Sequence, residues 1–129
     1  MRTFLCKWLP RLAIFLFLPA VVLVGWGELA ASPSVIERLV WDKALHFLAY
    51  SGLSGILSVA LKGGRRTLTA TVLLALFGAV LEILQGFTGR DPSVADECAN
   101  ILGAAAGAGA GWLVLYLVGL KSLAVRVPN

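Results

Sequence analysis

The sequence predicts an all-α membrane protein in which four transmembrane helices form a compact bundle. Its 129 residues are 59% hydrophobic and have a mean hydropathy of +0.88. A soluble domain of this length could not bury so much apolar surface, because a small domain leaves a large share of its surface exposed. The helices are expected at about residues 12–31, 44–61, 67–87 and 99–118, each near the ~20 residues that cross a ~30 Å hydrocarbon core.

The charged residues sort to the two ends of these segments. With an even number of spans, all seven acidic residues lie on one side. The other side carries eight of the 11 basic residues, namely Arg2, Lys7, Arg11, Lys62, Arg65, Arg66, Lys121 and Arg126. Because Lys and Arg accumulate in the cytoplasm, we predict a multi-pass protein of the bacterial inner membrane with cytoplasmic N- and C-termini. The +4 net charge sits in short loops, so no nucleic-acid partner is expected.

The first segment has two interpretations. Basic residues at 2–11, an apolar run at 12–27 and small residues at 30–32 resemble a cleavable secretory signal peptide. The run is long, however, and Trp8 and Trp26 stand near its two ends, where interfacial anchors belong. We therefore predict a retained transmembrane helix; cleavage would leave three spans and an external N-terminus.

The remaining segments have recognisable ends. Residues 35–41 alternate apolar and charged pairs at helical spacing, which predicts a short amphipathic segment on the outer interface. Asp42 suits the N-terminus of the second helix, and residues 62–66 form a basic turn before the third. The turn at 91–93 should cap the fourth helix, in which a stripe of small residues (Gly103, Gly107 and Gly111) favours close helix packing.

Polar side chains of three predicted helices fall at one shallow depth on the outer side. His46 and Asn100 each lie four residues inside an aspartate near the start of their helix, which is roughly 6 Å at ~1.5 Å per residue. Glu82 lies five residues before the end of its segment, roughly 7–8 Å inward. Glu28, at the end of the first helix, is expected to reach water.

These positions share faces that should point into the bundle, because an acid facing lipid is costly. Asp42, His46 and Tyr50 follow one another at intervals of four, and Glu82 and Gln85 lie three apart. The candidate catalytic residues are Asp42, His46, Glu82 and Asp96, and the candidate substrate-binding residues are Lys43, Tyr50, Gln85, Arg90 and Asn100.

Several of these residues also have purely structural interpretations. Asp42 and Asp96 could act as helix caps, Lys43 could extend to the interface, and Arg90 could pair with a neighbouring aspartate of its own loop. His46 could be a structural hydrogen-bonding group. A hard cation held by Asp42, Glu82 and Asp96 has no supporting ligand spacing, so neither a metal nor another cofactor is predicted.

Three sequence blocks resemble the VanZ-like family of small bacterial integral membrane proteins. They are Asp42-Lys43-x-x-His46-Phe47-x-x-Tyr50, then Glu82-x-x-Gln85 with Gly89-Arg90, then Asp96-x-x-x-Asn100-x-x-Gly103 with Gly107. One departure is Glu97-Cys98, where the family usually has apolar residues. The resemblance implies a single VanZ-like transmembrane domain over residues 1–129. It also implies an envelope protein of a family whose founding member is associated with resistance to teicoplanin, a glycopeptide antibiotic that binds lipid-linked cell-wall precursor.

Three functions are compatible with this pattern. The favoured one is binding or modification of a membrane lipid or lipid-linked envelope precursor at an outward-facing site, with Lys43 and Arg90 on an anionic headgroup and His46 with Asp42 as an acid–base pair. No nucleophile motif is present, so catalysis is left undecided. The alternative is a non-enzymatic adaptor or assembly protein whose polar cluster is an interhelical network. A transporter is least favoured, since no polar residue was recognised in the cytoplasmic half. The oligomeric state is not predicted.

Overall fold

The structure, a computed structural model, describes residues 2–30 and 41–119, and these ranges contain helices and no strand. The helices are α1 (Arg2–Leu29), α3 (Asp42–Ala60), α4 (Arg65–Gln85) and α5 (Val94–Leu117). The all-α prediction is confirmed for this part of the chain. Apart from Trp41, the amphipathic segment predicted at 35–41 lies outside the described residues.

The helices begin earlier than the apolar segments predict, and at α5 a capping residue fixes the start. Ser93 occupies the N-cap of α5, where its hydroxyl oxygen accepts a hydrogen bond from the backbone N–H of Asp96 at 3.3 Å. The predicted capping turn is therefore confirmed, and α5 starts five residues before position 99. Between α3 and α4 the backbone turns tightly through Lys62, Gly63 and Gly64, with φ of 60°, 75° and 80°, a conformation that glycine adopts without steric cost.

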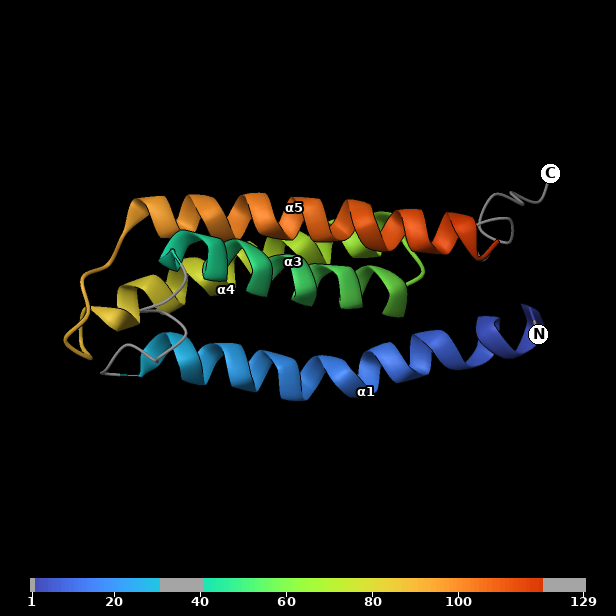
Figure 1. Cartoon of the computed structure of the whole chain (residues 1–129), viewed down its shortest axis with the longest axis horizontal. Coiled ribbons are helices and arrows are strands. Elements are labelled where there is room, and N and C mark those ends of the chain that lie inside the picture. The colour runs from blue at the N-terminus through green and yellow to red at the C-terminus, as the bar shows by residue number, and fades with distance from the viewer. Residues whose placement is uncertain (1, 31–40, 120–129) are drawn as a thin grey trace.

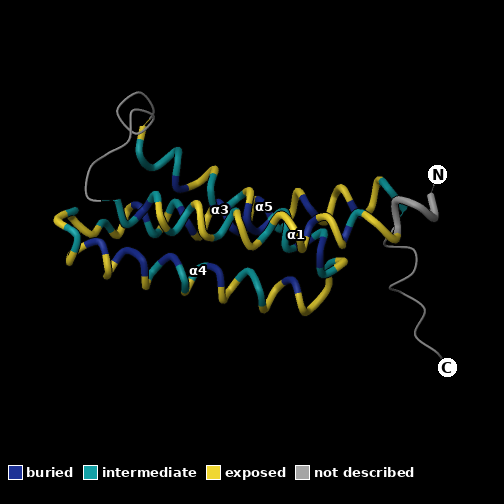
Figure 2. The backbone as a smooth tube through the Cα atoms, turned by 90° about the horizontal axis from the view of Figure 1, so that it is seen from below, coloured by how far each residue is buried: buried dark blue, intermediate teal, exposed yellow. Residues whose placement is uncertain are grey.

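The four helices lie side by side and alternate in direction along the chain, as Figure 1 shows. The ends of α1 and α4 and the starts of α3 and α5 therefore meet at one end of the molecule. Helix α3 packs against α1, α4 and α5, and its interface with α5 is the most extensive between the described helices. In Figure 2 the buried residues of α4 lie on the side that faces the other helices.

A glycine seam allows α3 and α5 to approach so closely. A Cβ atom on Gly103 would collide with the backbone of Phe47, and one on Gly107 would collide with the backbone of Ser51. A Cβ on Gly111 would lie 2.7 Å from the carbonyl oxygen of Gly55. The prediction that this stripe serves close packing is confirmed.

Three helices in the described ranges are long and apolar enough to cross a membrane. They are Lys7–Leu29, Arg65–Gln85 and Val94–Leu117, with hydropathies of 2.1, 2.1 and 1.5. Large apolar side chains such as Phe15, Ile83 and Leu102 point outward from these helices, as expected for a lipid-facing surface. These features indicate a membrane protein. Helix α3 is not among the three, and its buried residues include His46, Tyr50, Ser54 and Ser58.

Buried hydroxyl groups occupy the half of the molecule away from the α3 N-terminus, which corrects the expectation that this half lacks polar residues. Ser54 Oγ lies 3.2 Å from Thr71 Oγ1, and Thr71 Oγ1 donates to the carbonyl of Thr67 at 2.9 Å. Ser58 Oγ donates to the carbonyl of Ala108 at 3.1 Å. The sequence gives no signal for the cross-helix contacts of Ser54 and Ser58, because serine and threonine in a helix can equally bond their own backbone, as Thr71 does.

Candidate functional site

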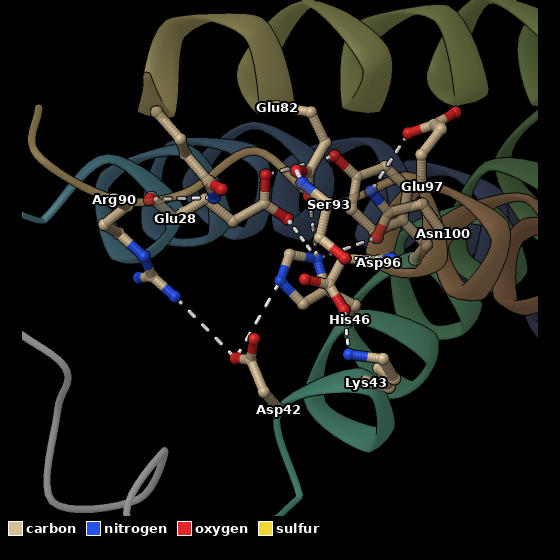
Figure 3. A network of polar contacts seen from close by, with 12 residues as sticks. Glu28, Asp42, Lys43, His46, Glu82, Arg90, Ser93, Asp96, Glu97 and Asn100 are labelled. Atoms are coloured by element: carbon tan, nitrogen blue, oxygen red, sulfur yellow. Dashed lines mark hydrogen bonds and ion pairs between the residues drawn. The ribbon is translucent and has the colours of Figure 1, made fainter. Parts of the chain in front are cut away.

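A cluster of buried polar side chains lies at the end where α1 and α4 finish and α3 and α5 start (Figure 3). Every described helix contributes to it. Its buried members are Glu28 from α1, His46 and Tyr50 from α3, Glu82 and Gln85 from α4, and Asp96 and Asn100 from α5. We call this set the polar cluster. In the described ranges, all buried ionisable side chains belong to it.

His46 is the centre of the polar cluster. Its Nδ1 atom lies 3.0 Å from Asn100 Oδ1, 3.5 Å from Glu28 Oε1 and 3.9 Å from Glu82 Oε1. Its Nε2 atom lies 3.9 Å from Asp42 Oδ1, one helical turn earlier in α3. The imidazole is therefore surrounded by carboxylates from three helices.

The partners of Asn100 define which nitrogen of His46 carries the proton. The Asn100 side-chain N–H group donates to Glu97 Oε2 at 3.2 Å, which orients the amide so that its oxygen faces His46. An amide oxygen only accepts hydrogen bonds, so Nδ1 must be the donor. In the neutral imidazole, Nε2 then keeps its lone pair, and this lone pair is on the side of Asp42.

Glu28 differs most from the sequence expectation. It is only 8% exposed, and its Oε2 accepts a hydrogen bond from the Tyr50 hydroxyl at 3.4 Å. The Gln85 amide donates to the Glu28 backbone carbonyl at 3.0 Å. The expectation that Glu28 reaches water is therefore wrong. The signal that could have identified it was its position in the last turn of α1, at the depth of the other three polar groups.

Glu82 joins α4 to the loop before α5. Its Oε2 accepts a hydrogen bond from the Ser93 backbone N–H at 2.9 Å. Its Oε1, although the residue is only 5% exposed, has no hydrogen-bond partner among the described residues, and it faces His46. A buried carboxylate oxygen without a donor is costly, so this atom marks a place where the interior is polar but incompletely satisfied.

Two basic side chains flank the cluster. Lys43 Nζ lies 3.0 Å from Asp96 Oδ1. Arg90, in the loop between α4 and α5, places a guanidinium nitrogen 3.7 Å from Asp42 Oδ1. Figure 3 shows Lys43 and Arg90 on either side of Asp42. Lys43 therefore pairs across helices, and Arg90 pairs with Asp42 as well as lying beside the acids of its own loop.

The nine residues predicted as catalytic or substrate-binding lie together at this end: Asp42, Lys43, His46, Tyr50, Glu82, Gln85, Arg90, Asp96 and Asn100. The sequence prediction did not include Glu28 and Glu97.

Neither Asp42 nor Asp96 acts as a cap through its side chain: α3 has no side-chain cap, and Ser93 caps α5. The capping interpretation of both aspartates is thus wrong, and their carboxylates are available for other contacts.

An apolar groove of about 540 Å³ runs between α1 and α3 up to the polar cluster. Its walls are mostly apolar, with Leu23, Val24 and Trp26 from α1 and Leu45, Leu48 and Ala49 from α3. Glu28, Asp42 and His46 form its polar part. The arrangement fits an amphiphilic ligand with a polar head beside an apolar chain.

Comparison of the chain with protein-family models, curated proteins and solved structures finds no match.

Proposed function

We propose that the chain is a VanZ-like protein of the bacterial inner membrane that binds a lipid or lipid-linked envelope component at headgroup depth. The observation that carries the proposal is the apolar groove between α1 and α3, which ends on Glu28, Asp42 and His46. A lipid tail would occupy the apolar part, and the headgroup would meet the polar cluster.

The proposal includes four spans, with α3 as the fourth. Helix α3 is 19 residues long, close to the ~20 needed to cross the hydrocarbon core. Tyr50, Ser54 and Ser58 are buried against neighbouring helices rather than turned to lipid, so the polar groups of α3 do not prevent insertion. With four spans and cytoplasmic basic residues, both termini are cytoplasmic and the polar cluster faces outward.

The charges of the site restrict the headgroup. Five carboxylates (Glu28, Asp42, Glu82, Asp96 and Glu97) lie in or beside the cluster, against the fixed cations Lys43 and Arg90. A phosphate would bind at the rim, where these two cations lie. Deeper in the cluster, carboxylates accept hydrogen bonds from hydroxyl or amine groups. A glycosylated lipid phosphate satisfies both conditions.

Mass spectrometry of lipids that co-purify with the protein tests this proposal. We expect one phosphorylated or glycosylated lipid to be enriched with the wild type and reduced with Ala49→Trp, because the indole fills the groove without altering the polar cluster. Leu76→Trp, at an exposed position of α4, is the matched control and should keep the lipid. Equal bulk phospholipid in all three samples, at equal protein yield, would contradict the proposal.

The non-enzymatic adaptor is the second candidate, and one observation favours it. Most members of the polar cluster already have partners within the protein, as an interhelical network requires. In that case Glu82→Gln would lower the yield of folded protein and its function in equal proportion. A lipid site would instead lose its ligand while the protein stays folded and inserted.

A further inference from the structure

Asp42, His46 and Asp96 bring three metal-ligating side chains to one point. One oxygen of each aspartate and one nitrogen of His46 lie within 4.8 Å of one another. Asp42 and His46 lie one turn apart in α3, and Asp96 lies in the first turn of α5. The glycine seam between these two helices is what makes the approach possible.

The orientation of His46 suits a metal ligand. Because Nδ1–H donates to Asn100 Oδ1, the lone pair of Nε2 lies on the side of Asp42. Nε2 and Asp42 Oδ1 are 3.9 Å apart, which is too far for a hydrogen bond. A Zn²⁺ ion lies about 2.0–2.2 Å from a nitrogen or oxygen ligand, so tetrahedral ligand atoms are about 3.4 Å apart. Nε2 and Asp42 Oδ1 would therefore approach each other by about half an ångström when an ion binds. Ligating histidines usually donate their other N–H to a fixed acceptor, the role Asn100 has here.

Asp96 already pairs with a cation. The residue is only 6% exposed, and its Oδ1 lies 3.0 Å from the ammonium group of Lys43, within hydrogen-bonding distance. The Lys43 side chain is 34% exposed. Lys43 can therefore withdraw into solvent and leave its place beside Asp96 to a more highly charged ion.

We infer that Asp42, His46 and Asp96 bind one divalent transition-metal ion of the Zn²⁺ type. Imidazole together with carboxylate favours such an ion over Mg²⁺ or Ca²⁺, which prefer oxygen ligands. Three protein ligands leave a coordination position open, and Asp42 and His46 also line the groove. The inference departs from the sequence-based prediction of no metal, and it is independent of whether a lipid binds.

Equilibrium dialysis with Zn²⁺, read by elemental mass spectrometry, tests the inference on the full chain in detergent after removal of lipid. Cys6 and Cys98 are replaced by serine throughout, since the exposed Cys98 thiol would itself bind Zn²⁺. We expect one ion per chain, with Mg²⁺ failing to compete. Asp42→Asn and Asp96→Asn should each weaken binding by at least about tenfold, because even the loss of an outer-shell partner costs about 10–100-fold.

Two further variants separate a specific site from general acidity or misfolding. Lys43→Met removes the ammonium group that competes for Asp96, so it should strengthen Zn²⁺ binding several-fold. Asp91→Asn, an exposed acid at the same end of the molecule, should leave binding unchanged. Less than one ion per chain, equal binding in the Asp96→Asn and Asp91→Asn variants, or weaker binding in Lys43→Met would each overturn the inference. None of these results decides whether a lipid co-purifies with the protein, so the lipid proposal and the metal inference can fail separately.

Discussion

At the scale of the residue, the buried position of Asn100 determines how the polar cluster is held together. Asn100 is fully buried, and its amide bonds His46 in α3 and Glu97 in its own helix. It therefore fixes both the orientation and the proton position of His46. No other buried amide in the described part of the chain contacts the imidazole.

Replacing Asn100 by alanine should destabilise the protein. The change leaves Nδ1–H of His46 without its closest acceptor in a buried site, which costs about 1–3 kcal/mol. Thermal unfolding in detergent measures the effect. Thr69→Ala, which removes an exposed hydroxyl bonded only to its own helix, is the control and should change stability by less than about 0.5 kcal/mol. Equal midpoints for the two variants would show that the Asn100 contacts do not stabilise the fold.

At the scale of the element, the seam between α3 and α5 positions the candidate metal ligands. The first turns of these two helices carry Asp42 and Asp96, and the backbones touch at Gly103 and Gly107. A larger separation of the helices would move the two aspartates apart. Packing and site geometry therefore depend on the same small residues.

The close contact at the glycine seam predicts different stabilities for alanine substitutions at two glycines of α5. A methyl group at Gly107 would collide with the Ser51 backbone, which cannot move without separating the helices. A methyl group at Gly109 would have no atom within 4 Å. Gly107→Ala should therefore destabilise by about 1–3 kcal/mol. Gly109→Ala should be neutral or stabilise by up to about 1 kcal/mol, through helix propensity. Unfolding midpoints in detergent compare the two, and similar losses in both would contradict the close contact.

At the scale of the whole molecule, the polar cluster lies at one end of the bundle. The rest of the described interior is mainly apolar and contains a few buried hydroxyl groups. The buried acids and His46 lie at one end, whereas the hydroxyl groups of Ser54, Ser58 and Thr71 are hydrogen-bonded farther along the bundle. In the described ranges, no ionisable side chain is buried in the second part. In this part of the described chain the buried polar groups are hydroxyls.

The proposed topology predicts which cysteine is accessible from outside. Cys98 is exposed in the first turns of α5, at the polar end, whereas Cys6 lies near the start of α1, at the opposite end. A membrane-impermeant maleimide applied to spheroplasts should label the Cys6→Ser variant, which retains Cys98. It should leave the Cys98→Ser variant unlabelled until the membrane is permeabilised. The reverse pattern would mean that the polar cluster faces the cytoplasm.

Sequence patterns alone locate the four helices approximately and place their polar groups at one level. Apolar length predicts a segment that can cross a membrane, and the helical rise places His46, Glu82 and Asn100 at one level. The glycine spacing in α5 also predicts a packing face. These features are local, since each follows from the period and rise of a single helix.

Which of these groups contact one another depends on how the helices pack. Glu28 is buried against Tyr50 because α1 packs against α3, and the first helix's own sequence gives no sign of that rotation. Similarly, Asn100 faces His46 and Lys43 reaches Asp96 because the glycine seam lets α5 approach α3. Pairing across helices depends on the rotation and separation of whole elements, which short-range patterns in one chain segment do not encode.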